Sequence, residues 1–434
     1  MGHYVFKKRI KKLLSSSFFS GSAIYLISNL AAAAIPFLLL PVLTRYLSTA
    51  EYGEVAIFQT LLIGLSSFVG ISAQGAASVK YYEDASTYRS YQSFIGSCFL
   101  VVVGTVFLTL ALTSLFLKPL SEGLSLAPIW IILGVIASGC SFVVLMRMGQ
   151  WQIRKQAKSY GLFQISQSAI NVLLSLLLVV GFSEGAAGRI LALSLTPLLY
   201  AIAAFYLLKK DNLIEISWRP KYLVEICAFG IPLIPHSMGY FLLSSADRFV
   251  INDRFGLADV GIYMVAVQLV SVMGLLFDAI NNAFVPWLYE RLKRNISSEK
   301  KEIVRWTYGY CLILICLVFL AFSIGPLLLT WIAGEKYKAA GQLVGWLALG
   351  QVLHGMYLMV TNYIFFSKRT GLLSLSTISA GLINIGLLIL LTSYMGLIGA
   401  AIAYAIAMGV KFICTWYIAN LRHPMPWFDF HRLI

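Results

Sequence analysis

Long apolar stretches alternate with short polar ones along the whole chain of 434 residues. Each apolar stretch has at least about 18 residues, which is long enough for an α-helix to cross roughly 30 Å of hydrocarbon. We therefore predict twelve membrane-spanning helices and no soluble domain. Their approximate ranges are 19–43, 55–77, 93–117, 127–146, 161–182, 187–208, 223–246, 260–287, 306–331, 341–366, 372–394 and 396–419.

A polar segment between the first two apolar stretches recurs about 208 residues later, near the midpoint of the chain. The copies are TRYLSTAEYG, residues 44–53, and DRFGLADVG, residues 253–261. Ser48 and Glu51 have the spacing of a capping box at the start of the second span, and we expect the glycine of each copy to allow close packing. The repeat predicts two six-helix halves of the same orientation, as in transporters whose site lies between halves.

These halves define the expected domain organisation. The fold class is all-α, a polytopic membrane protein with two six-helix pseudo-repeat halves around a central cavity. The expected parts are a cytoplasmic N-terminal anchor (1–18), an N-lobe (19–208), a cytoplasmic linker (209–222), a C-lobe (223–419) and a cytoplasmic C-terminal tail (420–434).

Composition and charge agree with this picture. The chain is 59% hydrophobic and only 12% charged, against roughly 25% charged in ordinary globular proteins. Its net charge of +15 is concentrated in the N-terminal tail and in the loops on that side, whereas the opposite loops are close to neutral. This asymmetry predicts that both termini are cytoplasmic. Because it explains the basic residues, it gives no support to nucleic-acid binding.

Ionisable groups are rare inside the predicted spans, where a charge costs roughly 2.5–3.5 kcal/mol. Asp278 is the hardest to explain as a packing residue, and Asn281 follows it by one turn. His236 follows two prolines that permit a bend in its span. The candidates for ion coupling or for a polar cavity are Asp278, His236, Asp247, His354 and Asn281.

Structural roles remain open for several of these residues. Lys411 is close enough to the interface to extend its ammonium group into water. Asp247 and Arg248 are able to pair with each other at the end of their span, and both histidines are able to pack as neutral, hydrogen-bonded residues. No P-loop, GxSxG, HExxH or paired-carboxylate signature is present in the sequence, so we expect neither an ATP-driven engine nor an enzyme.

The first span with its TRYLSTAEYG exit resembles the N-terminus of polysaccharide biosynthesis flippases, and SSADRFVINDRFGLADVGIYMVAVQL, residues 244–269, resembles the start of their second half. They belong to the multidrug/oligosaccharidyl-lipid/polysaccharide exporter superfamily. The resemblance implies a secondary transporter of the bacterial inner membrane. It would flip undecaprenyl-pyrophosphate-linked repeat units of O-antigen or capsule type from the cytoplasmic to the periplasmic leaflet. Implied partners are that substrate, membrane lipids, a glycan polymerase and the chain-length machinery, without nucleic acid.

A pyrophosphate group in the cavity would need cations, for which the candidates are Arg248, Lys411 and Arg45. H⁺ or Na⁺ would be the coupling ion, and we expect no cofactor, catalytic residue or metal site. A cation-coupled multidrug exporter of the same superfamily is the main alternative. An integral-membrane glycan polymerase is a further alternative, but it is expected to have a large external loop. A major-facilitator transporter is expected to have a basic loop between spans 2 and 3, where this chain has the neutral segment KYYEDASTYRS.

Overall fold

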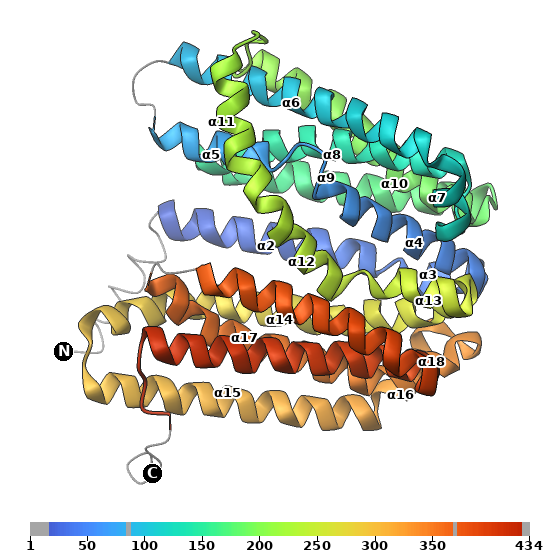
Figure 1. The fold of residues 1–434 in the computed structure, drawn as a ribbon, viewed down its shortest axis with the longest axis vertical. Coiled ribbons are helices and arrows are strands. Elements are labelled where there is room, and N and C mark those ends of the chain that lie inside the picture. The colour runs from blue at the N-terminus through green and yellow to red at the C-terminus, as the bar shows by residue number, and fades with distance from the viewer. Residues whose placement is uncertain (1–16, 84–87, 368–370, 428–434) are drawn as a thin grey trace. The chain divides into compact units, whose positions relative to one another are not determined.

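The computed structural model describes residues 17–83, 88–367 and 371–427, and all regular elements over those residues are helices (Figure 1). The chain forms two compact units. Unit 1 comprises Met1–Tyr46 and Leu61–Ile234, and unit 2 comprises Leu47–Thr60 and Pro235–Ile434. Most of the expected N-terminal anchor and the end of the C-terminal tail lie outside the described residues.

Unit 1 is built mainly from long helices. Within it α2 packs against α9, and α8 packs against both α6 and α10. Its elements are α2 (Ser17–Phe37), α3 (Leu40–Tyr46), the second part of α4 (Thr49–Ser66), α5 (Ala73–Glu83), α6 (Tyr88–Leu115), α7 (Leu117–Leu124), α8 (Pro128–Ile153), α9 (Ala157–Ser175), the π-helix η1 (Leu176–Gly181), α10 (Gly185–Lys210), α11 (Pro220–Gly230) and the 3₁₀ turn η2 (Ile231–Leu233).

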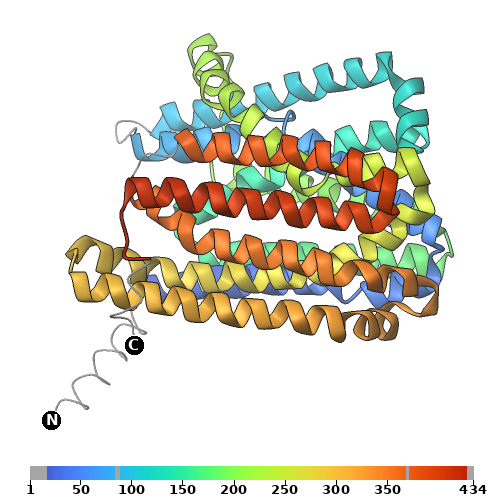
Figure 2. The ribbon, with the colours of Figure 1, turned by 60° about the horizontal axis from the view of Figure 1, so that its bottom comes forward.

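Unit 2 is organised around α17, which packs against α14, α15 and α18. These four helices lie side by side in both views (Figures 1 and 2). The elements are the first part of α4, α12 (Ile234–Ser244), α13 (Asp247–Phe255), α14 (Leu257–Arg294), α15 (Ser297–Ser323), α16 (Gly325–Ala333), the 3₁₀ turn η3 (Glu335–Ala340), α17 (Gly341–Phe366) and α18 (Gly371–Arg422).

Ten helices among the described residues are long and apolar enough to cross a membrane. Gly396, with φ 60° and ψ −140°, divides α18 into two segments, and these match the eleventh and twelfth expected spans. The expected second span is present as α4 and α5, but it is interrupted. The all-α, multi-pass architecture predicted from the sequence is therefore confirmed.

The first, second and seventh of the expected spans are broken well inside their predicted ranges. The first is broken between α2 and α3, beside Pro36 and Pro41, and the seventh is broken by η2, beside Pro232 and Pro235. Both breaks follow from proline, which removes a backbone donor and clashes with the preceding turn. The break between α4 and α5 was not expected from the sequence, because no proline lies there.

At that break Gly70, Ile71 and Ser72 all have positive φ, at 80°, 44° and 50°. The turn is fixed by its packing within unit 1. A Cβ added to Gly230 at the end of α11 would lie 1.9 Å from the carbonyl oxygen of Ile71, so only glycine permits this approach. The Gly70 amide donates to the Thr105 hydroxyl at 2.9 Å, which satisfies one of the freed backbone groups.

The two copies of the repeated segment meet through their glycines in unit 2. A Cβ on Gly53 would lie 1.8 Å from the carbonyl oxygen of Leu257, and a Cβ on Gly261 would lie 2.0 Å from that of Thr49. The first copy also forms the expected capping box: the Ser48 amide donates to the Glu51 carboxylate at 2.8 Å, and the Glu51 amide donates to the Ser48 hydroxyl at 3.2 Å. Both the close packing and the cap are confirmed.

Candidate functional site

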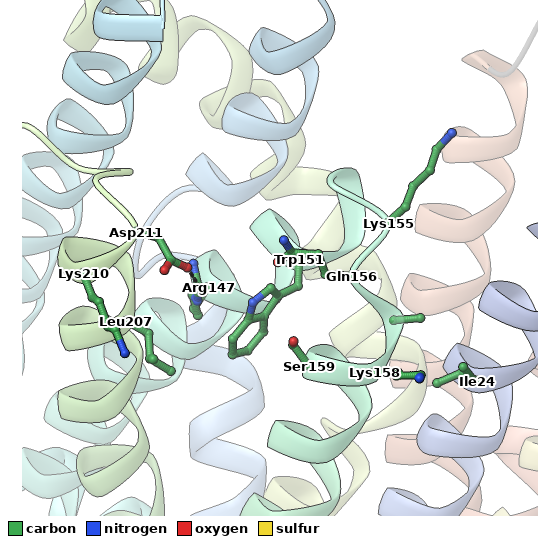
Figure 3. A pocket seen from close by; sticks show the side chains of 11 residues that line it. Ile24, Arg147, Trp151, Lys155, Gln156, Lys158, Ser159, Leu207, Lys210 and Asp211 are labelled. Atoms are coloured by element: carbon green, nitrogen blue, oxygen red, sulfur yellow. Dashed lines mark hydrogen bonds and ion pairs between the residues drawn. The ribbon is translucent and has the colours of Figure 1, made fainter. Parts of the chain in front are cut away.

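A cavity of about 560 Å³ lies in unit 1, where the C-terminal ends of α8 and α10 meet the start of α9 (Figure 3). We call it the basic pocket, because it combines four basic residues with one acidic residue. Its lining consists of Ile24, Arg147, Trp151, Lys155, Gln156, Ala157, Lys158, Ser159, Leu207, Lys210 and Asp211.

Arg147 is the buried centre of the basic pocket and is only 2% exposed. Residues four apart on a helix lie one above the other, and Trp151 accordingly lies under the guanidinium, whose Cζ is 4.2 Å from a ring centroid. Asp211 caps the end of α10 and accepts a hydrogen bond from Nη2 of Arg147. Nε of Arg147 is buried and has no hydrogen-bond partner within the described part of the chain.

Three lysines line the basic pocket together with this fixed arginine. Lys155 follows the end of α8 with a φ of 60°, Lys158 lies in the first turn of α9, and Lys210 ends α10. All three are exposed, and no ion pair joins them to a carboxylate among the described residues. Figure 3 shows Asp211 turned toward Arg147, with Lys158 on the Ile24 side and Lys210 on the other. The pocket thus has three mobile positive charges left for an anion.

Unit 2 contains a second group of charged side chains, inside its membrane-spanning helices. Nε2 of His354 on α17 lies 3.9 Å from Oδ1 of Asp278 on α14. The His354 ring stacks on Tyr357, one turn further along α17, with centroids 5.8 Å apart. Nζ of Lys411 on α18 lies 4.0 Å from the Tyr357 ring centroid. We call these four residues the polar line.

The polar line differs along its length in its contact with solvent. The Asp278 side chain is 56% exposed and the His354 side chain 20% exposed, whereas Lys411 is 3% exposed. Nδ1 of His354 is buried and has no hydrogen-bond partner among the described residues. Exposure to solvent thus decreases from Asp278 through His354 to Lys411.

One turn beyond Asp278, Asn281 continues this polar face of α14. Its Oδ1 accepts a hydrogen bond of 2.8 Å from Nδ2 of Asn362 on α17, and the same amide donates to the Leu358 carbonyl at 2.9 Å. The amide pair holds α14 and α17 together next to the carboxylate–imidazole contact. The separation of Asp278 from His354 is therefore set by packed helices rather than by flexible loops.

The pair Asp247 and Arg248 is buried at the start of α13, and both residues are less than 10% exposed. Nη1 of Arg248 donates to Oδ1 of Asp247 at 2.9 Å and also bonds to the Ser244 carbonyl. The Tyr263 hydroxyl donates to Oδ2 of Asp247 at 2.5 Å. Each charge is thus compensated locally, as a buried ion pair requires.

Known proteins resemble this chain in both sequence and fold. The family model described as polysaccharide biosynthesis protein matches residues 18–291. The chain belongs to this polysaccharide biosynthesis family. Among its relatives, the Lsg locus putative protein 1 of Haemophilus influenzae is 27% identical over 88% of this chain and 95% of its own length. The capsular polysaccharide biosynthesis protein CapF of Staphylococcus aureus is 24% identical over 90% and 96%, respectively.

Solved structures share the fold of this family member at low identity. The lipid II flippase MurJ in an inward closed conformation has a TM-score of 0.74 and 14% identity, with 92% of this chain and 87% of that chain covered. A multidrug resistance MATE transporter in an inward-facing conformation has a TM-score of 0.68 and 15% identity, with 92% and 94% covered. These likenesses show a shared fold, in agreement with the all-α, multi-pass fold class predicted from the sequence.

The structure brings together some of the residues predicted for this site and separates others. Asp278 and His354 are in contact, with Asn281 beside them and Lys411 two aromatic contacts away. His236 is exposed on α12, outside the polar line. Of the three cations predicted for pyrophosphate, Arg248 lies in its buried ion pair, Lys411 lies in the polar line, and Arg45 is exposed on α3 in unit 1. The roles of all these residues stay predictions.

The basic pocket was missed in the sequence, where its residues were interpreted only as evidence for orientation. A signal for it was present: Arg147 and Trp151 are four residues apart and are followed closely by Lys155 and Lys158. An arginine stacked on an interfacial tryptophan is held in place, whereas a charge that only sets topology needs no such partner. The residues that α10 adds to the pocket could not be predicted from the sequence, because their position depends on how α8 and α10 pack.

Proposed function

We propose that this protein moves a lipid-linked oligosaccharide from the cytoplasmic to the periplasmic leaflet of the bacterial inner membrane, with both termini in the cytoplasm. The proposed substrate is an oligosaccharide repeat unit on undecaprenyl pyrophosphate, and no bond is made or broken. Membership of the polysaccharide biosynthesis family supports this proposal, as does a relative named for capsular polysaccharide biosynthesis. The multi-pass helical fold supports a transporter.

The polar line is the observation that carries the coupling part of the proposal. A carboxylate inside a membrane-spanning helix is expensive and is usually kept for a purpose. An imidazole nitrogen is able to take up and give back a proton, so the contact of His354 with Asp278 suits proton binding. When the imidazole is protonated it attracts the Asp278 carboxylate across 3.9 Å, and when it is neutral this attraction is lost. Proton binding would therefore change how strongly α14 and α17 are held together.

Such a change biases transport only if the outward-open and inward-open states differ in proton affinity. We assign Asp278 and His354 to this step, with Asn281 keeping the helices in register. H⁺ is the favoured coupling ion because the contact pairs a carboxylate with an imidazole, and Na⁺ is the alternative. Lys411 supplies a fixed positive charge close to the same aromatic pair.

The other four predicted residues receive different assignments. Arg248 and Asp247 are assigned to stability, because every charge of that pair is already compensated within unit 2. Arg45 and His236 are exposed and remain candidates for contact with the polar part of the substrate.

The proposal is tested by deleting the gene and analysing lipid-linked glycans by leaflet. Complete repeat units on the cytoplasmic leaflet, with loss of surface glycan, are expected. Plasmid-borne wild-type protein should restore surface glycan, and Asp278→Asn protein present in equal amount in the membrane should not. Normal surface glycan in the deletion strain would contradict the proposal.

An ion-coupled multidrug exporter is the second candidate function, and the fold shared with a MATE transporter favours it. The two functions differ in their cargo. Increased drug sensitivity in the deletion strain together with unchanged lipid-linked glycans would identify the exporter. The free positive charges of the basic pocket disfavour a cationic drug at that place.

A further inference from the structure

We propose that the basic pocket of unit 1 is a binding site for the diphosphate headgroup of a polyprenyl-linked substrate. Its preference for a diphosphate follows from the pocket's own chemistry, and only the identification of that diphosphate as the transported lipid's headgroup rests on the proposed function. The pocket lies where basic residues gather, on the side from which the substrate would enter. It is distinct from the polar line, which belongs to unit 2.

The volume and lining of the pocket fit a headgroup. A cavity of about 560 Å³ falls within the roughly 300–1,000 Å³ typical of small-molecule sites. Beside its cations it has neutral donors in Gln156 and Ser159, which suit the oxygens of a first sugar. Polar side chains that converge from α8, α9 and α10 give such a ligand contacts on several sides.

The charges match a multiply charged anion better than a singly charged one. Asp211 already compensates Arg147, so the positive charges of Lys155, Lys158 and Lys210 are left over. Lysine binds phosphate as a mobile point charge, and these three exposed side chains are free to turn toward a ligand. A carboxylate or a single phosphate monoester would leave part of this charge unused, whereas a diphosphate would not.

Arg147 provides a donor that is ready before the ligand arrives. Its guanidinium is fixed between Asp211 and Trp151, so little side-chain freedom is lost on binding. Its buried Nε has no partner among the described residues, and a buried donor without a partner is unfavourable. The pocket thus holds one positively charged group in a fixed position before a ligand arrives.

The surroundings of the pocket also suit a ligand with a long apolar tail. Leu162 on α9 is 74% exposed, and Ile202 and Tyr206 on α10 are each 63% exposed. These side chains present an apolar surface beside the pocket, and Ile24 and Leu207 continue it into the lining. A polyprenyl chain would stay in the lipid along α9 and α10 while its diphosphate occupies the pocket.

Binding is tested with the purified full-length protein in nanodiscs of zwitterionic lipid. The probe is a fluorescent polyprenyl diphosphate, and the competitors are inorganic pyrophosphate and an anionic phospholipid such as phosphatidylglycerol. The pocket variant is Lys155→Gln/Lys158→Gln/Lys210→Gln. The control variant is Lys221→Gln/Lys293→Gln/Lys300→Gln, which removes the same charge from basic segments outside the pocket.

The pocket variant should bind the diphosphate roughly tenfold more weakly or worse, as expected for the loss of three charged contacts. The control variant should bind like the wild type, and pyrophosphate should compete better than phosphatidylglycerol. Equal binding by the two variants would overturn the proposal. Equal competition by phosphatidylglycerol would also overturn it, and would make the pocket a site for anionic lipid headgroups.

This test is independent of transport. Binding that depends on the pocket in a protein that flips nothing would refute the proposed function and leave the pocket assignment standing. Normal flipping by a pocket variant whose diphosphate binding is unchanged would refute the pocket assignment and leave the proposed function standing.

Discussion

The two units carry their charges in opposite ways. In unit 1 the cations of the basic pocket lie at helix ends, three of them exposed and unpaired among the described residues, around one arginine that is fixed in place. In unit 2 the polar line lies inside helices, where Asp278 faces the imidazole of His354 directly and the Tyr357 ring contacts both His354 and Lys411. Exposed, mobile cations suit the capture of a large anion. A carboxylate–imidazole contact that is open to solvent at its Asp278 end suits the uptake and release of a small cation.

This difference predicts that binding and coupling are separable by mutation. The largest effect is expected for Asp278→Asn, which removes the carboxylate but keeps the size of the side chain. Flipping driven by an ion gradient in proteoliposomes should fall to background, while polyprenyl diphosphate binding at the basic pocket stays at the wild-type level. Wild-type rates in the variant would remove Asp278 from the coupling mechanism.

Lys411→Met tests whether the buried lysine contributes to flipping while it lowers the stability of the fold. An isolated buried charge is costly, so a methionine of similar length should raise the free energy of unfolding by about 1 kcal/mol or leave it unchanged. Flipping should nevertheless decrease. Thermal unfolding and flipping are measured on the same preparation, and a variant that is markedly less stable would show that Lys411 has a structural role.

Tyr263→Phe tests a buried charge in unit 2 that we assign to stability alone. It removes the hydrogen bond to Asp247, and a buried carboxylate that loses a donor should cost about 1–3 kcal/mol. The unfolding temperature should decrease, whereas flipping per folded molecule should not change. Tyr240→Phe, at an exposed tyrosine, provides the control. A normal unfolding temperature with impaired flipping would instead place the pair in the transport mechanism.

The smallest effect is expected at His423, beyond the last span. Burial, helped by the charge of Lys300, lowers the pKa of His423 below its usual value of 6.5. The unfolded chain therefore binds this proton more readily than the folded protein does. The contribution of His423 to the free energy of unfolding is therefore complete above its usual pKa of 6.5, and it decreases as the pH falls through that value.

The unfolding temperature should thus drop slightly more between about pH 7.5 and about pH 5.5 in the wild type than in His423→Gln. His236→Gln, at an exposed histidine, is the matched control. An identical response of wild type and His423→Gln would show that His423 does not contribute.

Much of the fold follows from patterns that act locally. Apolar length defines the spans. Pro36 and Pro41 explain the break in the first span, and Pro232 and Pro235 explain the break in the seventh. Ser48 with Glu51 indicates a helix start. The break at Gly70–Ser72 could not be read in this way. It depends on the approach of Gly230 from a distant part of the chain and on the hydroxyl of Thr105.

The candidate sites show the same limit. Asp278 and His354 were recognisable one at a time because a charged or titratable group is rare in an apolar span. Their contact across 3.9 Å depends on the packing of α14 against α17. The basic pocket was hidden because its residues also satisfy the rule that orients membrane proteins. Because the charge asymmetry already accounts for these basic residues, the sequence gives no separate sign that they also line a pocket.

The contact between Gly53 and Gly261 has one more consequence. Each glycine faces the carbonyl that lies four residues before the other glycine, at Leu257 and at Thr49. Such reciprocity is the mark of an isologous interface, in which identical patches meet across a two-fold axis. The single polypeptide thus keeps, within unit 2, the form of a homodimer interface, and a shift that opens one side of this contact would have to open the other.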